Sequence, residues 1–259
     1  MQPWNLATIN QGITKQHKYE VAVLPLGATE PHNLHLPYST DTIEGTVIGE
    51  RLCESAWNAG AKVILLPTIP YGTETNLEAF PFAMNLNPLT LFQMITDLSV
   101  SLVRHGIRKI VLLNSHGGNE FKSFLRQIYD KSEAKFFLCN WYHVYLDVYH
   151  EIFDEMDDHA GEMEPSILLA TRPDLVARDQ NGNFTADQGI GKPTRFDAVN
   201  RGWVSITRPW HLFTTNGGSG NPHHATAEKG EKVINLVVER LAKFLVELSD
   251  SPLDDRFPY

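Results

Sequence analysis

The chain has 259 residues, and 42% of them are hydrophobic, which is enough to bury a sizeable core. It carries 22 Lys and Arg against 31 Asp and Glu, and this net charge of −9 argues against nucleic acid or an anionic membrane as the main partner. Its two cysteines, Cys53 and Cys139, lie in apolar segments and indicate free thiols in a reducing compartment. No stretch approaches the roughly 18 apolar residues of a membrane helix, and the start of the chain does not resemble a secretory signal, so we expect a cytoplasmic protein.

The first hundred residues alternate short apolar runs with amphipathic segments. Residues 21–26 are typical of a buried parallel strand, and residues 41–60 carry apolar side chains at helical spacing. Residues 62–67 predict a second strand, and residues 68–88 predict a loop able to cover a site. Residues 89–105 then predict an amphipathic helix.

The same alternation continues through the middle of the chain. Residues 110–113 predict a third strand, residues 120–129 a helix and residues 136–139 a fourth strand. A further helix is expected to begin near His159. Repeated strand-to-helix alternation predicts an α/β fold, a three-layer α/β/α sandwich with a mainly parallel sheet, and we expect residues 1–259 to form one domain.

The last third of the chain begins irregularly. Residues 172–224 are rich in Gly, Pro, Asn and Asp, which predicts a long loop-rich excursion tied to function or to an oligomer contact. Clean helical spacing returns over residues 225–248, which predicts a helix that closes the domain.

Metal-ligand residue types follow the first predicted strand. Glu30, His32, His35 and Asp41 lie within a dozen residues of one another. Their oxygen and nitrogen donors suit divalent Zn, Mn or Fe, and open α/β sheets bind ligands beyond the carboxyl ends of their strands. A catalytic metal is therefore expected at this position.

Two further segments offer similar side chains at strand ends or helix starts. His116 follows the third predicted strand, and residues 157–166 contribute His159, Glu162 and Glu164. Each residue also has a structural interpretation: Asp41 could cap a helix, and a lone histidine is more often structural than a ligand. Three separate segments that each offer such residues nevertheless favour a metal site.

The glycine clusters do not predict a nucleotide site. Gly117 and Gly118 precede a helix, as a phosphate-binding turn would, but the chain has neither G-x-G-x-x-G nor G-x-x-x-x-G-K-[ST]. The cluster at 216–221 follows no predicted strand. A nucleotide-dependent enzyme is therefore disfavoured.

Four ordered segments resemble the signature segments of the creatininase (creatinine amidohydrolase) family. They are LPLGATEPHNLHLPYSTD, NSHGGN, DHAGEMEPS and GGSGNPHHATAEKG. The resemblance implies an α/β/α layered fold, a dinuclear metal centre, hydrolysis of a small ring or amide, and a homo-oligomer, frequently a hexamer. It also implies that Glu30, His32, Asp41 and His116 are metal ligands, with Asp41 bridging two ions.

The chain departs from creatininase itself, which has a Tyr-Glu pair where this sequence has Gly117 and Gly118. Other branches combine the two glycines with an HAGE segment, so the resemblance implies that Glu162 supplies the fifth ligand. Further differences at Pro31 and Pro165 line the expected pocket and argue against creatinine as the substrate.

We therefore expect a metal-dependent hydrolase that opens a small cyclic amide or a related C–N bond. Glu164 or His159 would carry the proton to the leaving group, and Glu164 is favoured. One alternative is hydrolysis of a C–C bond in a cyclic, inositol-derived diketone. Another is a non-catalytic protein that binds a small ligand or a metal.

Overall fold

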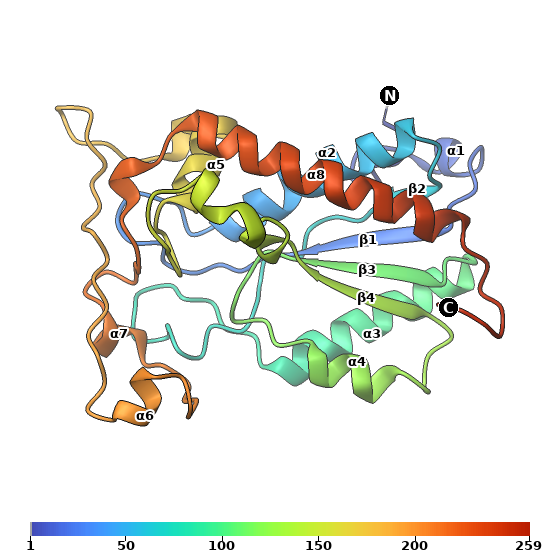
Figure 1. The fold of residues 1–259 in the computed structure, drawn as a ribbon. Coiled ribbons are helices and arrows are strands. Elements are labelled where there is room, and N and C mark those ends of the chain that lie inside the picture. Colours follow the sequence, from blue (N-terminus) through green and yellow to red (C-terminus); the bar gives the residue numbers. More distant parts are fainter. Residues whose placement is uncertain (1) are drawn as a thin grey trace.

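The computed structural model describes residues 2–259 and contains a parallel four-stranded sheet of order β2-β1-β3-β4 (Figure 1). The strands are Val21–Leu26 (β1), Val63–Leu65 (β2), Lys109–Asn114 (β3) and Lys135–Asn140 (β4). In register, Val23 pairs with Leu65 on one side and Val111 on the other. The predicted α/β fold with a mainly parallel sheet is confirmed.

Helices cover both faces of this sheet (Figure 1). One face carries α2 (Thr40–Asn58) and α8 (Ala227–Asp250), and α5 (Met163–Thr171) packs against both. The other face carries α3 (Pro88–Arg104) and α4 (Lys122–Ile128). The structure thus has the three predicted layers.

Side chains of β1 explain why two layers of helices are needed. Successive residues of a strand point to opposite faces. Val21 and Val23 pack into the core under α2 and α8, whereas Ala22 and Leu24 pack into the core under α3 and α4. A strand that is apolar on both faces is therefore buried on both, as its uninterrupted apolar sequence predicts.

The strand order places a switch point between β1 and β3. The chain leaves β1 towards α2 on one face of the sheet and leaves β3 towards α4 on the other. Loops that diverge in this way open a crevice at the carboxyl ends of the strands, where ligands of open α/β sheets bind. Glu30 follows β1 and His116 follows β3, so both reach this crevice.

Several segments are less regular than the sheet and its helices. The helix expected near His159 begins at Met163, after two short 3-10 helices at Trp141–His143 and Leu146–Glu151. The excursion at 172–224 contains only short helices, among them α6 (Asp197–Asn200) and α7 (Trp210–Phe213). Within the described chain, no helix combines the length and apolar character needed to cross a membrane.

The central strand β3 offers a test of the core. Leu112 is fully buried, so Leu112→Ala should lower the free energy of unfolding by about 2–5 kcal/mol through lost burial and a cavity. Leu89 on α3 is 74% exposed, and the matched Leu89→Ala should change it by less than about 0.5 kcal/mol. Urea unfolding measures both, and equal effects would contradict this packing.

Candidate metal centre

Side chains from three distant segments meet in one buried cluster. Glu30 and His32 follow β1, Asp41 lies in the first turn of α2, and His116 follows β3. His159 and Glu164 join them from the segment that leads into α5. All six are at most 8% exposed, which is unusual for charged residues unless they are paired or bind an ion. We call these six residues the centre: Glu30, His32, Asp41, His116, His159 and Glu164.

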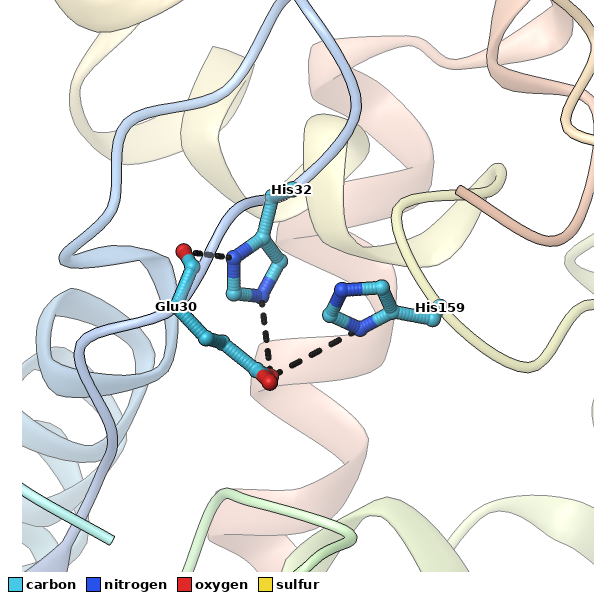
Figure 2. A group of neighbouring side chains, drawn as sticks. All are labelled: Glu30, His32 and His159. Carbon is cyan, nitrogen blue, oxygen red and sulfur yellow. Dashed lines mark hydrogen bonds and ion pairs between the residues drawn. The ribbon is translucent and has the colours of Figure 1, made fainter. Parts of the chain in front are cut away.

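His32 is anchored through one ring nitrogen and presents the other to the carboxylate of Glu30 (Figure 2). Its Nδ1 lies 3.0 Å from the carbonyl oxygen of Glu30, which can only accept, so Nδ1 carries the proton. Its Nε2 lies 3.0 Å from Asp41 Oδ1 and 3.7 Å from Glu164 Oε1. In the neutral imidazole, the Nε2 lone pair therefore points at negative oxygens, an arrangement that needs a cation or a proton between them.

His116 repeats this arrangement with its nitrogens exchanged. Its Nε2 lies 2.9 Å from Glu74 Oε1 and 3.2 Å from the carbonyl oxygen of Thr73. Its Nδ1 lies 3.1 Å from both Glu30 Oε1 and Asp41 Oδ2. A carboxylate behind a metal-binding histidine fixes the ring and its tautomer, and Glu74 has this position.

His159 is the third imidazole held in this way. Its Nε2 donates to the carbonyl oxygen of Pro31 at 3.0 Å, and its Nδ1 lies 3.7 Å from Glu30 Oε1. Figure 2 shows both His32 and His159 converging on the Glu30 carboxylate. Burial and the neighbouring His32 lower the pKa of His159 to about 4, so the ring is neutral at pH 7.

Asp41 divides its two oxygens between the two strand loops. Oδ1 faces His32 from the β1 loop, and Oδ2 faces His116 from the β3 turn. Neither Asp41 Oδ2 nor Glu30 Oε2 has a hydrogen-bond partner within residues 2–259, although both are buried. Buried carboxylate oxygens without donors are costly, and divalent cations would satisfy them.

The electrostatics of the cluster support the same fit. Burial raises the pKa of Glu30 well above its usual range, and burial raises the pKa of Glu164 to about 7. Burial would raise the pKa of Asp41 as well, but His32 and His116 outweigh it and lower that pKa. The residues present thus form a mixed carboxylate and imidazole donor set that fits Zn, Mn or Fe.

Glu162, the expected fifth ligand, is not brought to the centre. Lys229 of α8 donates to its Oε1, and the backbone N–H of Asp154 donates to its Oε2 at 2.9 Å. Glu164 faces His32 instead. The two residues are two positions apart at the start of α5, where the helical rotation of ~100° per residue points them to opposite sides.

Two other residues differ from the sequence interpretation. His35 is buried, but its ring packs near Phe184 with a centroid distance of 5.6 Å and neither nitrogen has a partner within the described residues. Sequence pattern does not predict Glu74, because it lies in the middle of the loop at 68–88 with no strand end beside it. Only the folded loop shows that Glu74 reaches His116.

Asp41 provides a direct test of metal binding. Because it faces both His32 and His116, we expect Asp41→Asn to weaken Zn or Mn binding by at least about tenfold. Competition with a chromophoric chelator measures the affinity. Asp158→Asn, at an exposed position on the rim of the same cavity, is the control and should bind metal as the unchanged protein does.

The raised pKa of Glu164 predicts how pH affects the metal-free protein. A carboxyl group whose folded-state pKa rises from 4.5 to about 7 stabilises the fold at low pH and loses that contribution as pH rises through about 7. His32 and His116, whose pKa values are also raised, act in the same direction. His159, whose pKa is lowered to about 4, acts against them, but only below about pH 6.5.

The urea midpoint of the metal-free protein should therefore fall between about pH 6.5 and about pH 8, and added metal should remove the fall. Glu164→Gln should make the pH dependence shallower. A midpoint that rises over this range would contradict the assignment of charges in the cluster.

Comparison with known proteins agrees with the geometry. The sequence matches the creatininase family, described as creatinine amidohydrolase, over residues 7–245. The mycofactocin precursor peptide peptidase of Mycolicibacterium smegmatis is 28% identical over 230 residues, covering 86% of this chain and 83% of that protein. The creatinine amidohydrolase of Pseudomonas putida is 26% identical over 249 residues, covering 88% and 89%.

Solved structures share the whole fold. The putative creatinine amidohydrolase from Bacteroides fragilis NCTC 9343 has a TM-score of 0.87 and 32% identity, covering 98% of this chain and 100% of its own. A manganese form of creatininase and a creatininase mutant of Zn-Zn type have TM-scores of 0.78 and 0.77 at 22% identity, covering 96% and 95% of this chain and 99% and 98% of theirs. With its sequence matched over nearly its full length, the chain belongs to the creatininase family of metal-dependent amidohydrolases.

Proposed function

We propose that the protein hydrolyses the C–N bond of an amide at a centre of two divalent ions. The observation that carries this proposal is the arrangement of Asp41, whose two oxygens face histidines from different loops. Glu30, His32, Asp41, His116 and Glu164 would hold the ions. Divalent ions in such a site supply a water of lowered pKa and polarise a carbonyl group.

His159 is suited to move the proton in this reaction. Its Nε2 is fixed by the carbonyl oxygen of Pro31, and the ring lines the cavity beside Glu30. A neutral imidazole can accept a proton at Nδ1 and return it to the departing nitrogen. Glu164, which the sequence favours for this role, faces His32 and is better placed to hold an ion.

The cavity at the centre suits a small-molecule amide. Its volume is about 380 Å³, within the range of cavities that hold small ligands. Aromatic side chains form much of its wall, among them Tyr142, Tyr145 and Trp210. They would exclude water from one side of the bound substrate while the polar centre lies on the other.

We further propose that each chain holds two ions drawn from Zn, Mn or Fe, and that the protein is a cytoplasmic homo-oligomer. Self-association is supported by exposed apolar side chains on the excursion at 172–224. Ile190, Trp203 and Leu212 are each more than 60% exposed, and such residues are commonly covered by another copy of the chain.

A substrate panel tests the proposed chemistry. Creatinine, other cyclic amides, short peptides and cyclic polyhydroxy ketones are incubated with metal-loaded and with chelated protein, and the products are followed by NMR. We expect metal-dependent hydrolysis of an amide. Turnover of a ketone alone would instead support C–C hydrolysis at the same centre, and activity that survives chelation would contradict the proposal.

Two variants separate the roles of His159 and Glu164. His159→Gln should lower kcat by about 10²–10⁴-fold while metal affinity is kept, because general acid–base catalysis contributes about that much. Glu164→Gln should weaken metal binding itself. Loss of metal in His159→Gln with retention in Glu164→Gln would reverse the assignment.

A further inference from the structure

A second, larger groove adjoins the cavity at the centre. This groove has a volume of about 730 Å³, against about 380 Å³ for the cavity at the centre. Asn76, Gly117, Gly118 and Arg208 line both. The two spaces therefore adjoin one another, and their combined size exceeds what a single small ring fills.

Gly117 lies where the two spaces meet, and we call this place the passage. A Cβ atom at this position would meet no other atom within 4 Å, so residue 117 borders open space. The neighbouring Gly118 differs, because a Cβ there would lie 2.3 Å from His116 Nε2. Gly118 is thus required by the packing of His116, whereas Gly117 leaves the passage open.

One wall of the groove is a stretch of backbone whose N–H and C=O groups have no backbone hydrogen-bond partners in the described chain. Residues 205–208 form no backbone hydrogen bonds within residues 2–259. On one side of this stretch, the N–H of Val204 donates to the carbonyl oxygen of Ala198 at 3.2 Å. On the other side, the N–H of Trp210 donates to the carbonyl oxygen of Asn76 at 3.1 Å. The wall is held at its ends and open along its middle.

Arg208 fixes the end of this wall that is nearer the centre. Its guanidinium lies over the rings of Trp210 and Phe213, each with a centroid distance of 4.4 Å. It also donates to Asp158, next to His159. The arginine is thus held from three sides, and the wall keeps its place beside the centre.

The lining of the groove suits an extended amide chain. Val204 and Ile206 alternate with Ser205 and Thr207, so apolar and hydroxyl side chains alternate along the wall. The backbone N–H groups of Gly117 and Gly118 also have no partner in the described part of the chain. Free backbone groups on the wall and at the passage can pair with the main chain of an extended peptide, as sheet edges do in peptide recognition.

We propose that this groove binds the extended, peptide-like part of an amide substrate whose scissile bond lies at the centre, and that Gly117 sets the width of the passage. This inference rests on the proposed amide chemistry and adds a substrate class and a subsite to it. A substrate held only in the cavity at the centre would gain nothing from the groove.

Binding of metal-directed probes tests the groove without requiring turnover. Acetohydroxamate and the hydroxamates of an acetylated dipeptide and tetrapeptide are titrated by calorimetry into the zinc-loaded full chain. We expect the tetrapeptide probe to bind at least about tenfold more tightly than acetohydroxamate. Equal affinities would overturn the inference even if the protein hydrolyses amides, whereas a failure to hydrolyse any amide would leave the measured length dependence intact.

Matched variants test whether the groove supplies the extra affinity of the tetrapeptide probe. Val204→Trp should fill the groove and reduce the ratio of the two affinities to about 1, and Gly117→Leu should do the same by closing the passage. Val100 on α3 has a similar exposed fraction, 46% against 50% for Val204, and Val100→Trp should leave the ratio unchanged. Because each ratio is taken within one variant, a change in metal affinity cancels.

The outcomes decide the assignment. A lower ratio in both groove variants with an unchanged ratio in Val100→Trp supports it. An unchanged ratio in Val204→Trp, or an equal fall in Val100→Trp, overturns it.

Discussion

The structure depends on one electrostatic constraint, which is the burial of several carboxylates within a few ångströms of one another. Glu30, Asp41, Glu74 and Glu164 are removed from solvent together with three imidazoles. Like charges at such separations cannot remain ionised without compensation. Each imidazole therefore turns one nitrogen towards a fixed acceptor and the other towards the carboxylates, and the remaining negative charge calls for divalent ions.

The topology of the sheet brings these charged side chains together without distorting the strands. Parallel strands end at the same edge of the sheet, and the switch point between β1 and β3 separates their following segments. The resulting crevice needs no deformation of the sheet, because its walls are the loops that diverge to opposite faces. The apolar layers on either side provide the rigid support that a ligand set needs if its atoms are to stay within fractions of an ångström of their working positions.

Much of the fold and all six residues of the centre could be predicted from sequence, because these residues follow strand ends or lie near helix starts. The apolar run of β1 predicts a buried strand, and Glu30 and His32 follow it within a few residues. Because the strand ends of a parallel sheet share an edge, this pattern also predicts where the two side chains lie. Glu162 and Glu164 show the limit. Which of them faces the centre depends on the rotation at the start of α5, and that helix begins at Met163 rather than near His159. Glu74 depends on the path of a long loop, which no periodicity describes.

The contact between Lys229 and Glu162 links the charge balance beside the centre to the order in which the chain is synthesised and folds. Glu162 lies between His159 and Glu164, and its charge is matched by an ammonium group from α8, the last helix in the chain. During synthesis, β1, α2 and β3 emerge with Glu30, His32, Asp41 and His116 well before Lys229 does. All six residues of the centre are thus synthesised before Lys229, whereas Glu162 beside them has no ammonium partner until α8 docks. The charge of Glu162 is therefore balanced only late in folding, when the last helix packs against α5.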